Sequence, residues 1–197
     1  MTKEQNENLK YDEQLCIFYY EIEDFECAGR ISAELLEDNG QNYTALLVLG
    51  LIEEDLGNYP HAINYYNKIL TVYEDDPQCL KRKAYAELNC QNNSQAMDDI
   101  NKSIDSDPND PEAYIIRGMI HFHSYHRKKE AIIDYNQALK IDPENICGLY
   151  NRGLTFLRIG NKQYAYDDLN KAAKLGDLES EILIKKYFPE KTPESSR

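Results

Sequence analysis

Five alanines recur at an almost constant interval along this chain of 197 residues. They are Ala28, Ala62, Ala96, Ala131 and Ala165, and the intervals between them are 34, 34, 35 and 34 residues. A small residue that recurs at this spacing indicates an array of one supersecondary unit stacked on itself. Because such an array offers a long surface rather than an enclosed pocket, the periodicity predicts a binding protein rather than an enzyme.

A 34-residue frame that places each alanine at position 20 divides most of the chain into five repeats. Position 8 is always small and position 24 is mostly bulky, which predicts two closely approaching helices with the bulky side chain packed beside the small one. Proline at position 32, in Pro108 and Pro143, is expected to end the second helix. The five repeats cover residues 9–42, 43–76, 77–110, 111–145 and 146–179, and the fourth has one extra residue within 123–129.

The last three repeats show the pattern most clearly; they include KAYAELNCQNNSQAMDDINKSIDSDPND, IRGMIHFHSYHRKKEAIIDYNQALKIDPEN and NRGLTFLRIGNKQYAYDDLNKAAKL. In these segments, and over residues 9–179 as a whole, the chain resembles the tetratricopeptide repeat family. The resemblance implies an all-α fold, an α-solenoid of five helix-turn-helix repeats that wind into a right-handed superhelix. It also implies a non-catalytic module for protein–protein interaction, such as a scaffold or adaptor.

The segments outside the repeats are short. Residues 1–8 are polar and are expected to be disordered. Residues 180–188 are expected to form a capping helix over the last repeat, and residues 189–197 a disordered tail. The apolar residues of this carboxyl-terminal segment that fit a helical stripe are Leu178, Ile182, Leu183 and Phe188.

The longest apolar run, Ala45–Ile52, is too short to cross a membrane, which takes about 20 residues. The amino terminus lacks the hydrophobic stretch of a secretory signal. Both features predict a cytoplasmic protein without a membrane partner. The five cysteines show no disulfide framework and are expected to pack as small buried apolar residues, although Cys16 with Cys27 and Cys79 with Cys90 could face each other across a hairpin.

The net charge of −13 is graded along the chain. Residues 1–42 hold 11 acidic and 3 basic side chains, whereas residues 146–197 hold 7 acidic and 9 basic side chains. The gradient could steer a charged partner, favour head-to-tail contacts between copies, or serve solubility alone. Since the first two repeats have almost no Lys or Arg, no nucleic-acid partner is expected.

The resemblance implies that positions 2, 5, 9, 12 and 13 of each first helix line a concave groove. Twelve of the 25 side chains at these positions are bulky and apolar or aromatic, which is typical of a binding surface. The apolar ones would anchor a peptide or an amphipathic helix, and the charged ones would set its register. Alternatively, the stripe packs between neighbouring first helices, or the carboxyl-terminal tail or a second copy fills it. The predicted groove residues are Leu47, Leu51, Glu54, Asp55, Lys81, Tyr85, Leu88, Ile115, Met119, Phe122, Tyr150, Leu154 and Arg158.

Some members of the family clamp the acidic carboxyl terminus of heat-shock chaperones with a set of Lys, Asn and Arg residues in three consecutive repeats. No window of three repeats in this chain carries that set; the first window, for example, has Glu13 and Ile17 at the first two clamp positions. The sequence therefore predicts no carboxylate clamp.

Charged residues at positions 7 and 11 predict ion pairs between neighbouring repeats, Glu53 with Lys83 and Glu87 with Arg117. A structural ladder is the preferred interpretation, and a catalytic pair of carboxylates is the alternative. His121, His123 and His126 form a local histidine cluster, but their spacing differs from the i,i+4 pair of zinc helices, so no metal is expected.

No glycine-rich phosphate loop and no nucleophile motif is present. The chain is therefore expected to be no enzyme and to hold no cofactor. The leading hypothesis is a module that binds an unidentified protein or peptide in its concave groove. The alternative is a self-assembling scaffold whose copies join through the acidic amino-terminal end and the basic carboxyl-terminal end, with a weak homo-oligomer as one possible outcome.

Overall fold

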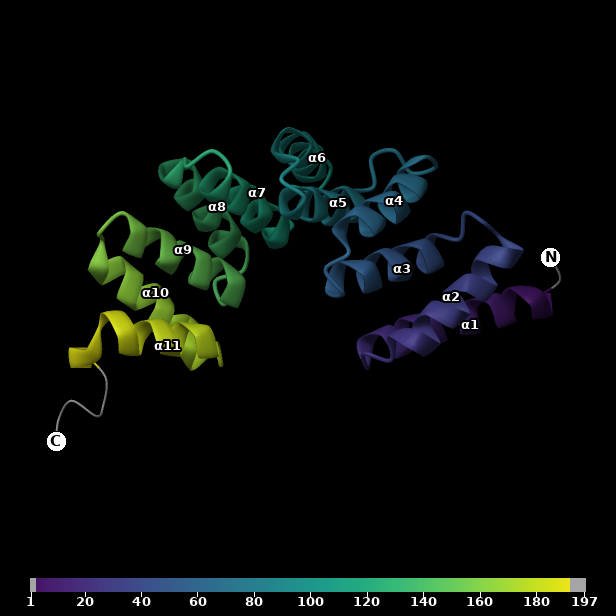
Figure 1. Cartoon of the computed structure of the whole chain (residues 1–197), viewed down its shortest axis with the longest axis horizontal. Helices are drawn as coiled ribbons and strands as arrows, with labels where there is room; N and C mark the ends of the chain where they lie inside the picture. Colours follow the sequence, from purple (N-terminus) through teal and green to yellow (C-terminus); the bar gives the residue numbers. More distant parts are fainter. Residues whose placement is uncertain (1–2, 192–197) are drawn as a thin grey trace. The chain divides into compact units, whose positions relative to one another are not determined.

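The computed structural model describes residues 3–191, and over this range the fold is entirely helical (Figure 1). Two compact lobes divide the chain: the N-terminal lobe ends at Ser106 and the C-terminal lobe begins at Asp107. The helices of the N-terminal lobe are α1 (Lys3–Glu21), α2 (Phe25–Asp38), α3 (Tyr43–Asp55), α4 (Tyr59–Leu70), α5 (Pro77–Asn89) and α6 (Asn93–Ser106). Those of the C-terminal lobe are α7 (Pro111–His123), α8 (Lys128–Ile141), α9 (Ile146–Arg158), α10 (Lys162–Lys174) and α11 (Leu178–Tyr187), followed by the 3-10 helix η1 (Pro189–Lys191).

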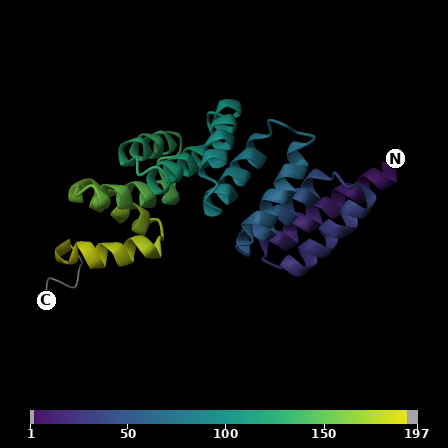
Figure 2. The same cartoon turned by 45° about the horizontal axis from the view of Figure 1, so that its top comes forward.

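Consecutive helices pair as hairpins, and the hairpins stack within each lobe. The pairs in the N-terminal lobe are α1 with α2, α3 with α4 and α5 with α6, and the second helix of one hairpin packs on the first helix of the next. The C-terminal lobe repeats this order with α7 to α10, and α11 then packs on α10 (Figures 1 and 2). The architecture is thus an α-solenoid of helix-turn-helix repeats closed by a carboxyl-terminal capping helix.

The helix boundaries follow from local capping. A side-chain oxygen of Asn or Asp precedes the first helix of the second to fifth repeats, and of α11, and accepts a backbone N–H from the first turn. These capping residues are Asn42, Asp76, Asp110, Asn145 and Asp177. The turns inside the hairpins contain a residue with positive φ; Gly57 and Gly160 supply it without strain, whereas His126 supplies it in the fourth repeat.

Small and bulky side chains meet inside each hairpin at positions 8 and 24. A Cβ added to Gly50 would lie 2.5 Å from Tyr66, and one added to Gly118 would lie 2.4 Å from Tyr135. Both tyrosines are fully buried, so the missing Cβ is what allows the two helices of the hairpin to approach. The packing that the repeat frame predicts for these two positions is therefore present.

The two ends of the array differ from expectation. Helix α1 begins at Lys3, so residues 3–8 are helical and not disordered as predicted; Lys and Glu are good helix formers, and the helix simply extends outward. Residues 1–2 lie outside the described residues. At the other end η1 occupies residues 189–191 of the predicted tail, and residues 192–197 lie outside the described range.

The capping helix buries a different face from the predicted one. Ser180, Ile184 and Phe188 are buried against α10, whereas Leu178 and Ile182 are 70% and 62% exposed. Two sets of residues spaced i,i+4 lie on different faces of this short helix. Packing on α10 buries the face that contains Ser180 and Ile184. The predicted stripe was therefore right for Phe188 and for Leu183, which packs partly buried on the same cluster, and wrong for Leu178 and Ile182.

All five cysteines are free thiols, and their environments are unequal. Cys16 and Cys79 are buried, in agreement with packing as small apolar residues, but Cys147 is exposed. Burial raises the pKa of Cys79 to about 12, which leaves this thiol protonated and unreactive. Within the described residues, no helix combines the length and the apolar character needed to span a membrane.

Candidate binding surface

The predicted anchors of the N-terminal lobe lie on its first helices, Leu47 and Leu51 on α3 and Tyr85 and Leu88 on α5. All four side chains are half-buried. Leu47 packs partly on the core below it, and the Tyr85 ring meets the Tyr59 ring edge-on with centroids 6.2 Å apart. All four side chains are thus partly covered by the protein and still present part of their surface to solvent, as binding anchors typically do.

The C-terminal lobe presents a similar set. Met119 and Phe122 on α7, and Tyr150 and Leu154 on α9, are half-buried. Ile115 is only 4% exposed, so it belongs to the core and cannot act as the predicted anchor. The position of a residue in the repeat predicts that it lines the groove, but it does not reveal how much of the side chain its neighbours cover.

Glu54 has a structural role in place of the predicted contact with a partner. Its carboxylate is buried, and it accepts hydrogen bonds from the Tyr66 hydroxyl at 2.8 Å and from Arg82 Nη1 at 3.2 Å. Burial raises the pKa of Glu54, and the positive charge of Arg82 opposes that shift. The carboxylate therefore ties α3 to α4 and α5, and it is not available to set the register of a guest.

The remaining charged residues of the predicted set have different environments. Lys81 is only 3% exposed, so it too is removed from the accessible surface. Asp55 is exposed and accepts a hydrogen bond from the Tyr20 hydroxyl at 2.8 Å, a contact that joins α3 to α1. Arg158 is exposed at the end of α9. Burial of the His123 side chain, together with the positive charge of Arg158, lowers the pKa of His123. Asp55 and Arg158 are thus the two charged residues of the set that a partner can reach.

The basic residues at position 7 pair inside their own hairpins. In the third, fourth and fifth repeats, this residue forms an ion pair of 2.7 Å with the aspartate at position 23 of the second helix. The pairs are Lys83 with Asp99, Arg117 with Asp134, and Arg152 with Asp168. The expected pair of Glu53 with Lys83 is wrong, because Glu53 lies 3.6 Å from His61 and Lys83 contacts residues of its own hairpin.

The sequence does contain the signal for these pairs. The first two repeats have Leu15 with Ile31 and Leu49 with Tyr65 at positions 7 and 23, so an acidic residue occurs at position 23 only where a basic residue occupies position 7. Comparing the five repeats position by position, instead of looking only for neighbours between repeats, would have found the pairs.

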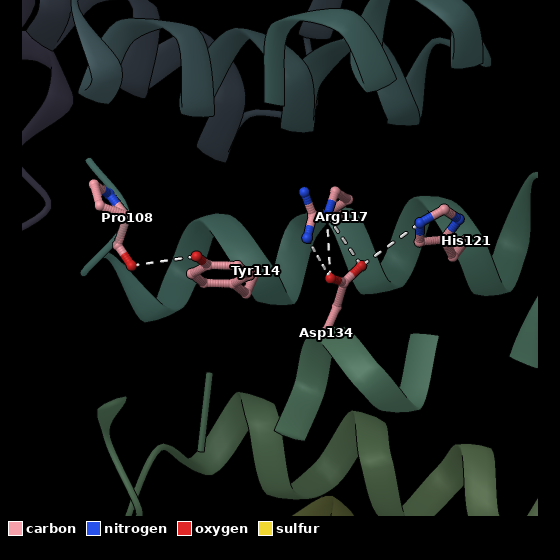
Figure 3. Close-up of polar contacts among 5 residues, drawn as sticks. All are labelled: Pro108, Tyr114, Arg117, His121 and Asp134. Atoms are coloured by element: carbon pink, nitrogen blue, oxygen red, sulfur yellow. Dashed lines mark hydrogen bonds and ion pairs between the residues drawn. The ribbon is translucent and has the colours of Figure 1, made fainter. Parts of the chain in front are cut away.

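Figure 3 shows the pair of the fourth repeat. Arg117 donates to Asp134 Oδ1 from Nη2 at 2.7 Å and from Nε at 3.1 Å, and His121 Nε2 lies 3.6 Å from Asp134 Oδ2. On the same helix the Tyr114 hydroxyl donates to the Pro108 carbonyl at 3.2 Å, which fixes the start of α7. Burial lowers the pKa of His121 despite the opposing charge of Asp134.

The histidine cluster does not converge. His121 faces Asp134, the His123 ring meets Phe122 edge-on at 4.8 Å, and His126 lies in the turn. In the described part of the chain, no group of three or more His, Cys, Asp or Glu side chains is arranged to hold a metal ion.

A buried carboxylate in the third repeat makes folding sensitive to pH. Lys83 Nζ lies 2.7 Å from Asp99 and 3.6 Å from Glu87, so two carboxylates share one cation. Burial, aided by the charge of Asp99, raises the pKa of Glu87 to about 7. The folded protein therefore holds a proton at Glu87 more tightly than the unfolded chain does, and this contribution to stability is present at low pH and lost as the pH rises through about 7.

Glu87→Gln is expected to remove this dependence, because glutamine mimics the protonated acid. Between about pH 4.5 and pH 7 the free energy of unfolding of the unmodified protein should fall relative to that of the variant. Urea unfolding of both proteins across this range measures the difference, in which the contributions of the histidines cancel. A difference that stays constant with pH would contradict the assignment to Glu87.

Two family models match this chain. A model described as TPR repeat matches residues 127–160, and a model described as tetratricopeptide repeat matches residues 20–78. Sperm-associated antigen 1 of Mus musculus is 29% identical over 91 residues, which is 45% of this chain and 10% of that protein. The chain therefore spans only a tenth of the length of this relative.

Solved structures reproduce the fold along almost the whole chain. The crystal structure of MamA protein is 22% identical with a TM-score of 0.66, and the match covers 93% of this chain and 97% of that one. TTC0263, a thermophilic TPR protein of Thermus thermophilus, is 15% identical with a TM-score of 0.78 over 90% and 97% of the two chains. PilF of Pseudomonas aeruginosa is 12% identical with a TM-score of 0.79 over 95% of each chain. At these identities the likeness concerns the fold alone.

The repeat matches and the stacked hairpins identify the class: residues 20–78 and 127–160 of this chain are tetratricopeptide repeats. This fold is a non-catalytic framework for protein–protein interaction. The family that the repeat pattern indicated is confirmed.

Proposed function

We propose that this protein binds a segment of another protein through apolar anchors on the inner sides of its first helices. The observation that carries the proposal is the half-buried state of Leu51, Tyr85, Met119, Phe122 and Leu154. Each is partly covered by the rest of the protein and yet accessible. A peptide or an amphipathic helix that inserts apolar side chains between the anchors of one lobe would remove their exposed surface from water.

Charge would orient the bound segment. In the N-terminal lobe the exposed carboxylate of Asp55 can receive a basic residue of the partner, and in the C-terminal lobe the exposed Arg158 can receive an acidic one. Glu54, Lys81 and Ile115 take no part, since they are buried. Tyrosine and methionine suit such a surface because tyrosine is rigid and amphipathic and methionine adapts its shape.

The proposal is tested with peptides selected from a random library displayed on phage against the full chain. The affinity of the selected peptides is then measured by fluorescence anisotropy. Tyr85→Ala combined with Met119→Ala is expected to weaken binding by at least about tenfold, because truncated anchors lose most of the contact energy. The thermal unfolding of the double variant should stay close to that of the unmodified protein.

A matched control removes apolar surface elsewhere. Ile133→Ala combined with Tyr164→Ala truncates side chains that are 66% and 59% exposed on the second helices α8 and α10. This variant should bind the peptides as the unmodified protein does. If the anchor variant unfolds early, or if both variants bind equally well, the inner surface is not the binding site.

Self-assembly is the second candidate function. The observation that favours it is the uneven charge, since the acidic residues gather in residues 1–42 and the basic ones in residues 146–197. A contact between the first hairpin of one copy and the last helices of another would therefore bring opposite charges together. The cytoplasmic location expected from the sequence stays a prediction.

A further inference from the structure

Positions 3 and 10 of a first helix pack against the second helix of the preceding hairpin. In α3, positions 3 and 10 are Ala45 and Ile52, which are 0% and 7% exposed and lie in one core cluster with Ile31 and Leu35 of α2. The same positions therefore mark the stacking face of a first helix.

Helices α5 and α9 repeat this arrangement. Cys79 and Ala86 of α5 are completely buried, and the Cys79 thiol lies 3.3 Å from the carbonyl oxygen of Tyr66 on the preceding helix. In α9 the two positions are Gly148 and Thr155, both buried, and a Cβ on Gly148 would lie 3.2 Å from Leu139 of α8.

Helix α1 carries large aromatic residues at these two positions and has no helix before it in the described residues. Tyr11 is 63% exposed and Phe18 is 51% exposed. The first repeat of an array normally presents a polar outer face, because that face meets water. Two aromatic side chains one above the other on the stacking face instead indicate that another helix covers it.

The last helix of the C-terminal lobe presents a face of suitable chemistry. On α11, Leu178 and Ile182 are 70% and 62% exposed, and Lys186 follows one turn later on the same face. The side chain of Lys185 beside them is 70% exposed and lies 4.0 Å from the carboxylate of Glu181 on the same helix. This end therefore offers an apolar pair with basic neighbours.

We propose that the face of α1 formed by Tyr11 and Phe18 docks α11 of a second copy of this chain. The inference rests on the second candidate function and gives it a surface. An antiparallel arrangement that sets Tyr11 against Ile182 places Glu7, one turn before Tyr11, opposite Lys186. The two ends are different surfaces, so the contact is heterologous and each added copy leaves one end of each kind open.

The test uses variants of both ends in the full chain. The head variant combines Tyr11→Ser with Phe18→Ser, and the tail variant combines Leu178→Ser with Ile182→Ser. Light scattering coupled to size exclusion measures the mass at increasing protein concentration in low and high salt. The unmodified protein is expected to form species larger than a monomer whose mass falls as salt rises, because the ends carry opposite charges.

Each variant alone is expected to be a monomer, with an association constant lowered by at least about tenfold. An equimolar mixture of the two should form a dimer that grows no further, since the intact tail of one fits the intact head of the other. Ile133→Ser with Tyr164→Ser, which removes exposed apolar surface from α8 and α10, should assemble normally. Circular dichroism checks that every variant keeps its helical content.

The possible results distinguish a failure of the proposed docking surface from a failure of self-assembly itself. If the unmodified protein stays a monomer at all salt concentrations, both self-assembly and the proposed surface are wrong. If it assembles but the head and tail variants assemble as well, the function stands and the surface is wrong. If the tail variant alone still forms dimers while the head variant does not, α1 pairs with α1 of another copy, and the head-to-tail contact is overturned.

Discussion

Replacing Asp134 by alanine is expected to lower the free energy of unfolding by about 3 kcal/mol. The Asp134 side chain is 5% exposed, and it is the counter-ion of Arg117, which donates to it from both Nε and Nη2. Its loss leaves a guanidinium in the hairpin without its carboxylate. Because 24% of the Arg117 side chain reaches solvent, the effect should lie at the lower end of the range for breaking a buried pair.

The chain itself provides the control for this prediction. The first repeat places Leu15 and Ile31 at the positions of Arg117 and Asp134. Arg117→Leu combined with Asp134→Ile should therefore recover most of the stability that Asp134→Ala loses, because an apolar pair costs no desolvation of charge. Urea unfolding of the three proteins measures both effects. A loss below about 1 kcal/mol for Asp134→Ala would show that solvent already screens the pair.

Gly118→Ala is expected to lower the free energy of unfolding by about 1–3 kcal/mol, although alanine is the better helix former. The added methyl group would lie 2.4 Å from Cε1 of Tyr135. That ring is 1% exposed and packs in the centre of the hairpin, so it has no room to move aside. The two helices must then separate, and contacts along the whole hairpin weaken.

Gly29→Ala is the matched substitution. Gly29 lies inside α2, and no atom comes within 4 Å of a Cβ built there. Only the helix propensity changes at this position, so the variant should gain roughly 0.5–1 kcal/mol. If close approach of the helices at position 8 stabilises the hairpins, thermal or urea unfolding should show changes in the free energy of unfolding of opposite sign for the two variants. Equal effects at Gly118 and Gly29 would contradict that explanation.

The hairpins could be derived from the sequence because their determinants are local and repeated. A small residue at position 8, a bulky one at position 24 and alanine at position 20 specify how two adjacent helices pack, and five copies fix the frame. The pairs at positions 7 and 23 are also local and repeated. The sequence-based prediction nevertheless assigned Lys83 and Arg117 to partners in neighbouring repeats, whereas they pair with Asp99 and Asp134.

The binding surface was less predictable, since exposure depends on side chains that come from other helices. Glu54 is buried beside Tyr66 and Arg82, which both donate hydrogen bonds to its carboxylate. Neither contact can be predicted from the position of Glu54 in the repeat. The face of α11 was equally uncertain from sequence, because Leu178 and Ile182 form as good an apolar series as Ser180, Ile184 and Phe188. Only docking on α10 decides which series is buried.

The central claim is that the inner sides of the first helices receive the partner. The most direct measurement places a photo-crosslinking residue, p-benzoylphenylalanine, at Leu51 on α3, at Leu154 on α9 or at the exposed Ile133 on α8, and irradiates each protein with a selected peptide. We expect covalent adducts from the proteins labelled at Leu51 and Leu154 and none from the protein labelled at Ile133. Adducts from Ile133 alone would place the partner on the outer helices and contradict the claim.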